Sequence, residues 1–224
     1  MSKMLASVNS VEEALLVFNA QVDIIDLKQP AQGALGALPT DLVREIVEII
    51  AGRSPVSATI GDLPMQPELV FNAVQAMAKT GVDYIKIGFF PDGDSLATVK
   101  LLAELTPQYA LIAVLFADTQ PDFSIISALK QSGFVGVMLD TMDKKRGSLT
   151  QVMNPTELAH FVKLAQTQQL LCGLAGSLKL ADIATLLPYQ ADYLGFRGAL
   201  CAEQQRTAKL NPAAIAEIKR AIAQ

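Results

Sequence analysis

The sequence contains very little histidine and cysteine. His160 is the only histidine among 224 residues, and Cys172 and Cys201 are the only cysteines. Catalysis by Ser-His-Asp or Cys-His groups, and a metal site built on imidazoles, would all depend on that one histidine. His160 lies in the helical pattern Thr156-Glu-Leu-Ala-His, with no nucleophile or second metal ligand beside it. We therefore expect lysine and carboxylate chemistry without a metal or a cofactor.

Excess positive charge and long apolar runs are also absent. The 18 Lys and Arg residues face 22 Asp and Glu, a net charge of −4, which argues against binding to nucleic acid or to a membrane surface. No run approaches the roughly 18 apolar residues of a membrane span, and two cysteines form no disulfide framework. We expect a cytoplasmic protein with reduced thiols. Its 51% hydrophobic composition supplies a large core, and we also expect a homo-oligomer.

Short runs rich in Val, Ile and Leu alternate with stretches of helical periodicity, which is typical of parallel βα units. We count eight such runs: Met4–Val8, Asp23–Lys28, Pro55–Ile60, Asp83–Gly88, Ala110–Phe116, Gly136–Asp140, Leu170–Gly176 and Tyr193–Gly198. Eight units in 224 residues leave 28 residues each, close to the minimum for a strand, a helix and two loops. The pattern predicts a single-domain TIM (β/α)8 barrel over residues 1–224. A doubly wound sheet is the alternative, but Ser7-Val-Asn-Ser10 after the first strand lacks its glycine-rich turn.

Charged residues occur at the carboxyl ends of three predicted strands, where barrel enzymes place their active sites. Asp26 and Lys28 are two residues apart, so both side chains point to the same side of the second strand. Lys86 lies between isoleucines in the fourth strand, and Asp140 ends the sixth. A charged residue at one strand end is often a solvated loop residue. Two lysines inside apolar strands are harder to explain that way, because a buried ammonium needs a partner or a function.

Two partly desolvated amines close together each favour loss of a proton, and a neutral amine attacks carbonyl carbons. Asp26 and Asp140 could then transfer protons during formation of the imine and its enamine. Lys144 or Lys145, which follow Asp140 in a loop, could lie over the barrel mouth. The sequence thus predicts Schiff-base chemistry.

Further polar residues and glycines predict contacts to substrate. The third strand places two hydroxyl groups on one face, and glycine-rich turns follow the seventh and eighth strands. Such turns often bind phosphate through backbone N–H groups, although tight turns also need glycine for steric reasons alone. The residues predicted to bind substrate are Ser57, Thr59, Lys145, Gly176, Ser177, Arg197 and Gly198.

Four segments resemble one known family along the whole chain. The sequence resembles (5-formylfuran-3-yl)methyl phosphate synthases in Asp26-Leu-Lys-Gln-Pro-Ala-Gln-Gly-Ala-Leu-Gly-Ala37, Val56-Ser-Ala-Thr-Ile-Gly-Asp-Leu-Pro64, Asp83-Tyr-Ile-Lys-Ile-Gly88 and Leu139-Asp-Thr-Met-Asp-Lys144. The resemblance implies a TIM-barrel lyase that condenses two molecules of glyceraldehyde 3-phosphate into a furan aldehyde phosphate and releases phosphate and water. The product would serve the biosynthesis of methanofuran or methylofuran, carriers in one-carbon metabolism.

The resemblance also implies roles for individual residues. The family's D-x-K motif matches Asp26 and Lys28, and its lysine is the Schiff-base residue. The strand lysine of the family matches Lys86, and its D-T-x-x-K motif matches Asp140 and Lys144. This chain departs from the family after Lys144, where Lys-Arg-Gly replaces the usual Asp-Gly.

Two other functions fit the same residues. A class I aldolase, or another phosphosugar lyase on the same barrel, would also use a lysine imine. A barrel that only binds a phosphorylated ligand or a flavin for a partner is a further alternative. Retention of both inward lysines and both acids argues against a pure binding protein.

Overall fold

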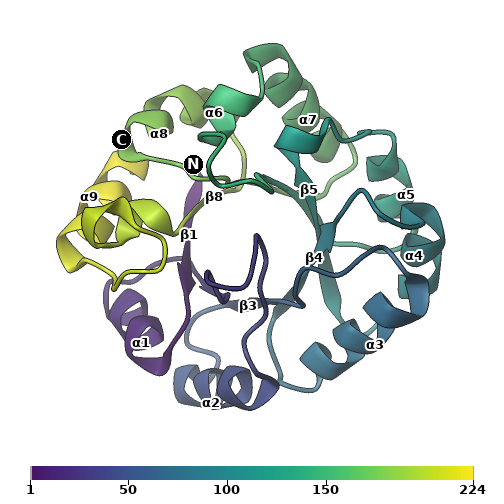
Figure 1. Cartoon of the computed structure of the whole chain (residues 1–224), viewed down its shortest axis with the longest axis horizontal. Coiled ribbons are helices and arrows are strands. Elements are labelled where there is room, and N and C mark those ends of the chain that lie inside the picture. Colours follow the sequence, from purple (N-terminus) through teal and green to yellow (C-terminus); the bar gives the residue numbers. More distant parts are fainter. Residues whose placement is uncertain (1, 224) are drawn as a thin grey trace.

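The computed structural model describes residues 2–223, so Met1 and Gln224 of the predicted domain lie outside it. Eight parallel strands close into a barrel in sequence order, with β1 hydrogen-bonded to β8 (Figure 1). The predicted TIM barrel is confirmed. Its strands are β1 Lys3–Val8, β2 Ile24–Leu27, β3 Val56–Thr59, β4 Tyr84–Phe89, β5 Ala110–Phe116, β6 Gly136–Asp140, β7 Leu171–Leu174 and β8 Tyr193–Phe196.

Helices form a ring outside the strands (Figure 1). They are α1 Val11–Asn19, α2 Thr40–Ile50, α3 Pro67–Ala78, α4 Ser95–Leu102, α5 Ile125–Gln131, α6 Leu149–Val152, α7 Pro155–Thr167, α8 Leu180–Leu186 and α9 Pro212–Ile222. Short 3-10 turns lie at Ala117–Thr119 (η1), Leu187–Tyr189 (η2), Gly198–Leu200 (η3) and Ala202–Gln204 (η4). Within residues 2–223, no helix has the length and apolar character that crossing a bilayer requires.

Local sequence signals fix where individual helices begin. Ser10 caps α1, because its hydroxyl accepts a hydrogen bond from the backbone N–H of Glu13. Asn154 caps α7 in the same way through Glu157, and Pro155 occupies the first helical position, where no N–H is needed.

The period-two alternation of each strand separates an outer core from the barrel interior. In β2, Ile25 and Leu27 are fully buried beneath the helices, while Asp26 faces inward. The same alternation in β4 buries Ile85 and Ile87 outside and turns Lys86 inward. The predicted facing of both strands is confirmed.

The loop between β2 and α2 enters the mouth of the barrel (Figure 1). We call residues 29–39 the plug loop. Leu35 is fully buried there against a small interior cluster that includes Phe116. The carboxylate of Asp62 accepts hydrogen bonds of 2.7 Å from the N–H groups of both Ala34 and Leu35. A Cβ at Gly33 would lie 2.0 Å from Asp62 Oδ2, so this close approach requires glycine. The plug loop therefore fills part of the mouth.

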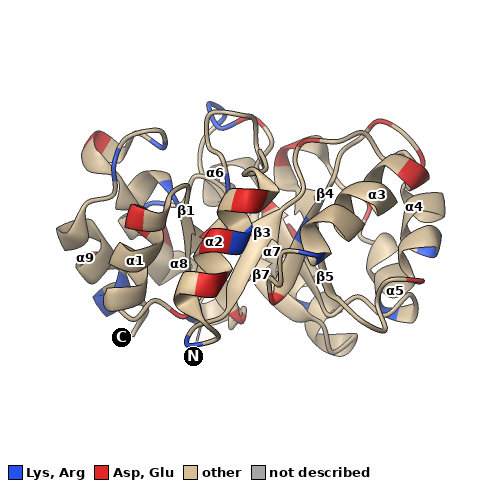
Figure 2. Ribbon diagram, turned by 90° about the horizontal axis from the view of Figure 1, so that it is seen from below, with Lys and Arg blue, Asp and Glu red and all other residues tan. Residues whose placement is uncertain are grey.

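Figure 2 shows the barrel from the side. Both chain ends lie at its lower edge, at the amino ends of the strands, and charged loops extend from the opposite edge. The carboxyl ends of the strands thus open toward the charged loops.

Candidate active site

A cavity of about 460 Å³ opens at the carboxyl ends of the strands, beside the plug loop. Seven of its lining residues are Lys or Arg and two are Asp, in a protein whose net charge is negative. Such a concentration of positive charge favours an anionic ligand. The lining residues are Leu5, Ser7, Asp26, Lys28, Lys86, Asp140, Lys144, Lys145, Ala175, Gly176, Ser177, Leu178, Lys179, Gly195, Phe196, Arg197, Gly198, Ala199, Gln204 and Arg206.

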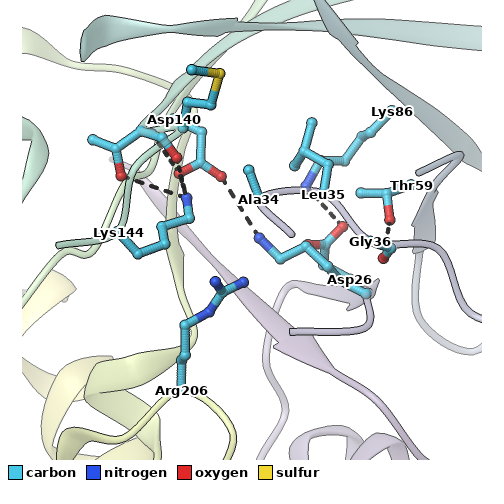
Figure 3. A network of polar contacts seen from close by, with 12 residues as sticks. Asp26, Ala34, Leu35, Gly36, Thr59, Lys86, Asp140, Lys144 and Arg206 are labelled. Atoms are coloured by element: carbon cyan, nitrogen blue, oxygen red, sulfur yellow. Dashed lines mark hydrogen bonds and ion pairs between the residues drawn. The ribbon is translucent and has the colours of Figure 1, made fainter. Parts of the chain in front are cut away.

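Asp26 and Lys86 form a buried ion pair at the floor of this cavity (Figure 3). Lys86 Nζ lies 2.9 Å from Asp26 Oδ1, and Ser57 Oγ donates to the same oxygen at 2.6 Å. Ser57 thus orients Asp26 and is absent from the cavity lining. Asp26 Oδ2 has no hydrogen-bond partner among the described residues. One oxygen of this carboxylate is therefore fixed, and the other is available.

Asp140 lies on the other side of the cavity, where it contacts Lys144, the backbone of Thr141 and Lys28. Lys144 Nζ donates to Oδ1 at 2.5 Å and also to the backbone oxygen of Thr141 (Figure 3). The N–H of Thr141 donates to the same carboxylate oxygen at 2.7 Å. Burial raises the pKa of Asp140, but the charges of Lys144 and Lys28, together with these hydrogen bonds, outweigh it and hold the pKa well below its usual range. Asp140 is therefore a stable carboxylate.

Lys28 is the amine without a hydrogen-bond acceptor. Its side chain is buried, its nearest ion-pair contact is Asp140 Oδ2 at 3.6 Å, and no described residue accepts a hydrogen bond from its nitrogen. Burial lowers the pKa of Lys28, Asp140 and Asp26 oppose this shift, and the charges of Lys144 and Lys86 add to it, so that the pKa is about 8. A substantial fraction of Lys28 is then a neutral nucleophile near physiological pH.

The structure separates the two lysines that the sequence could not distinguish. Lys144 reaches Asp140, whereas Lys145 is exposed at the rim of the cavity. Only Lys144 therefore belongs to the network of buried charges.

The turn after β7 offers backbone N–H groups to the cavity. Gly176 and Ser177 both have positive φ angles, 112° and 47°. A Cβ at Gly176 would lie 2.9 Å from the backbone nitrogen of Thr141, so glycine allows the loops after β6 and β7 to touch. The N–H groups of Ser177 and Leu178 donate to no other described residue, and Gly198 lines the cavity after the neighbouring strand β8. These groups can receive an anion.

Two predicted substrate contacts have structural roles in the chain itself. Thr59 Oγ1 donates to Gly36 O at 3.0 Å, which ties β3 to the plug loop outside the cavity lining. Arg197 pairs with the buried Glu13 and donates to three backbone oxygens, those of Ser7, Arg206 and Ala208. These contacts occupy every N–H group of the guanidinium, so Arg197 supports the wall and has no donor left for a substrate.

Arg206 is a second arginine of the cavity wall. Its guanidinium is half-buried, lines the cavity and donates to the plug-loop oxygen of Gly33 at 2.9 Å. Figure 3 shows it pointing toward the pair formed by Asp140 and Lys144. Burial lowers the pKa of Arg206, and the charges of Asp140 and Asp62 oppose that shift. No sequence pattern indicated Arg206, because it lies in an irregular segment beyond the last strand.

Comparison with known proteins connects this cavity to a family. Residues 4–219 match the profile of the 4-HFC-P synthase family. The chain belongs to this family of enzymes. A Methylorubrum extorquens protein, which carries the name (5-formylfuran-3-yl)methyl phosphate synthase provisionally, is 40% identical over 220 residues, 98% of this chain and 91% of its own. The (5-formylfuran-3-yl)methyl phosphate synthase of Methanosarcina acetivorans is 34% identical over 218 residues, 92% and 93% of the two chains.

Solved structures of other barrels confirm the fold. The 3-hexulose-6-phosphate synthase of Salmonella typhimurium superposes with a TM-score of 0.71 at 13% identity, covering 99% of this family member and 98% of that chain. A phosphoribosyl anthranilate isomerase from Thermus thermophilus gives a TM-score of 0.70 at 12% identity, covering 100% and 98%. At these identities the likeness concerns architecture alone.

The two arginines predict opposite mutant phenotypes. R197M leaves the Glu13 carboxylate buried without its cation, so we expect the free energy of unfolding to fall by about 3–5 kcal/mol. R206M removes a half-buried cation and should change unfolding by less than about 1 kcal/mol. It should instead weaken the binding of inorganic phosphate by roughly tenfold or more. Denaturant unfolding and phosphate titration calorimetry measure both effects; equal destabilisation by the two variants would contradict the assignment.

Proposed function

We propose that this enzyme condenses two molecules of glyceraldehyde 3-phosphate into (5-formylfuran-3-yl)methyl phosphate, with release of one phosphate and two waters. The observation that carries this proposal is the Lys28 amine, buried without a hydrogen-bond acceptor in a cavity lined by six other Lys and Arg residues. Such an amine forms imines with aldehydes, and the surrounding charge suits two phosphate esters.

The carbon skeleton of the product fixes which atoms must be joined. Its furan ring carries the phosphomethyl group on carbon 3 and the formyl group on carbon 5. One triose must therefore react as its ketone isomer, dihydroxyacetone phosphate, at the carbonyl carbon. The other triose must lose phosphate from its carbon 3, and that carbon forms the new bond. A triose held as an imine at its aldehyde carbon can lose that phosphate and then form the new bond at carbon 3.

The first stage generates the carbon nucleophile. The amine of Lys28 adds to the aldehyde carbon, water leaves, and an iminium forms. Asp140, whose Oδ2 lies 3.6 Å from the Lys28 nitrogen, removes the proton on carbon 2. The electron pair of that C–H bond forms the carbon–carbon double bond of an enamine. The enamine electrons then expel phosphate from carbon 3 of the triose. Lys144 and Arg206 stabilise the departing dianion.

The second stage joins the two trioses. The terminal CH2 of the resulting enol attacks the ketone carbon of dihydroxyacetone phosphate, and Asp26 takes the enol O–H proton as carbon 2 becomes a ketone. Lys86 stabilises the negative charge that develops on the former ketone oxygen, and that oxygen then receives the proton that Asp26 took from the enol. The free hydroxyl of the ketotriose then closes the five-membered ring on carbon 2, and two waters leave. Hydrolysis of the imine restores the Lys28 amine and releases the formyl group, so the atoms balance.

The phosphate contacts divide between two walls. The backbone N–H groups of Ser177 and Leu178, together with Gly198 after the neighbouring strand β8, suit the phosphate that is retained in the product. The side of the cavity formed by Lys144, Lys145 and Arg206 suits the one that leaves. Holding both trioses against one amine can contribute roughly 7–11 kcal/mol to the lowering of the barrier.

Turnover and trapping test this reaction together. Pure protein given glyceraldehyde 3-phosphate should form an ultraviolet-absorbing furan and one phosphate per furan. Borohydride added during turnover should reduce the imine and leave a stable mass increase on the peptide that contains Lys28. K28A should lose both activity and adduct while it keeps the circular dichroism of the wild type. A hexose bisphosphate formed without the chromophore would indicate an aldolase and contradict the proposal.

The pH dependence of the rate should report the Lys28 amine. The neutral fraction rises with pH, so kcat/KM should increase to a plateau with an apparent pKa near 8. Removing the Lys144 charge in K144M raises the Lys28 pKa, which moves this limb to higher pH. Removing the Asp140 charge in D140N lowers the pKa, which moves the limb to lower pH. Because Asp140 is also the proposed base for carbon 2, the limb is measured in both variants as the rate of imine formation, trapped with cyanoborohydride from pH 6 to 10; two shifts in the same direction would contradict the assignment to Lys28.

A further inference from the structure

Two buried polar atoms at the cavity floor have no partner in the described chain. They are Ser7 Oγ and Asp26 Oδ2, on side chains that are only 3% and 1% exposed. Both residues line the cavity. Buried polar groups in proteins are nearly always hydrogen-bonded, because an unpaired one costs free energy. This pair therefore marks a place where a ligand group completes the hydrogen bonding.

The barrel register places these two residues side by side. Ser7 and Asp26 are register partners on β1 and β2, and adjacent strands lie about 4.8 Å apart. Ala6 and Val8, the sequence neighbours of Ser7, are buried in the outer core, so Ser7 faces the interior with Asp26. One small polar group can contact both side chains.

The chemistry of the pair selects a hydroxyl group. Asp26 Oδ1 already accepts from Lys86 and Ser57, so Oδ2 is an acceptor whose position is fixed by its partner oxygen. The serine hydroxyl can donate as well as accept. A ligand hydroxyl that donates to Asp26 and accepts from Ser7 uses both atoms. A carbonyl or a phosphate would leave the carboxylate oxygen facing another acceptor.

We propose that Ser7 and Asp26 bind the hydroxyl on carbon 2 of the triose that reacts with Lys28, so that Ser7 determines specificity for α-hydroxyaldehydes. This inference rests on the proposed function. Lys28 follows Asp26 by two residues and faces the same way, and the imine nitrogen and the hydroxyl oxygen sit on adjacent carbons of the triose. The hydroxyl that contacts Asp26 is the one whose proton must leave when the new carbon–carbon bond forms.

Two stable phosphate esters test the hydroxyl contact without imine formation. Glycerol 3-phosphate carries the carbon 2 hydroxyl, and 3-hydroxypropyl phosphate lacks only that group. The wild-type protein should bind the first roughly fiftyfold more tightly, about tenfold from the hydrogen bond to the charged Asp26 and about fivefold from the bond to Ser7. In S7A the preference should fall to about tenfold, and S7T, which keeps the hydroxyl, should restore it. S2A removes a buried serine hydroxyl that bonds Ala191 O, outside the cavity lining, and should leave the preference unchanged.

The outcomes separate the inference from the proposed function. If the wild type binds both esters equally, or S7A keeps the full preference, Ser7 is no specificity residue and the inference fails, while the proposed reaction stands. If neither ester binds the wild type, the triose phosphate substrate fails and the inference falls with it. Melting temperatures provide a second readout: S7A should melt no lower than the wild type, because it removes an unpaired buried hydroxyl. A fall of several degrees would assign Ser7 to the fold.

Discussion

Three lysine amines share two carboxylates in the mouth of this barrel, and the site depends on that imbalance. Burial of an ammonium group is costly unless a carboxylate or hydrogen-bond acceptor compensates it. Lys86 pairs with Asp26 at 2.9 Å and Lys144 pairs with Asp140 at 2.5 Å. Lys28 is the third amine, 3.6 Å from an oxygen of a carboxylate that Lys144 already engages. Burial makes the ammonium form of Lys28 less stable than it would be in water, so the pKa falls to about 8 and a fraction of the amine is neutral near physiological pH.

The scaffold holds this arrangement through hydrogen bonds and ion pairs within the chain. Thr59 and Asp62 fix the plug loop by hydrogen bonds to its backbone. The loop occupies the part of the barrel mouth that lies beside the cavity. Arg197, tied to Glu13 and to three backbone oxygens, supports the opposite wall. Ser57 fixes one oxygen of Asp26. Reactive groups are therefore positioned by neighbours whose own hydrogen bonds are complete.

The fold and the central charges could be predicted because strand periodicity is local. Alternation alone placed Asp26, Lys28 and Lys86 inside the barrel, and Asp140 followed from its strand end. Arg197 was expected to bind substrate, but its partner Glu13 lies 184 residues away in sequence, a distance that no local pattern spans. Arg206 belongs to an irregular segment, and Ser7 looked like an ordinary strand end. The sequence could not show whether Lys144 or Lys145 reaches the site, because this depends on the conformation of their loop. A homo-oligomer remains a prediction.

The chain belongs to the 4-HFC-P synthase family, and the reaction proposed for it depends on the side-chain nitrogen of Lys28. The most direct measurement is an NMR titration of lysine side chains in isotopically labelled protein, with the Lys28 signal assigned by its absence in K28M. A midpoint near pH 8 for that signal is the expected result. A midpoint near 10.5, the ordinary value for lysine, would mean that Lys28 stays protonated, and the proposed imine chemistry would then lack its nucleophile.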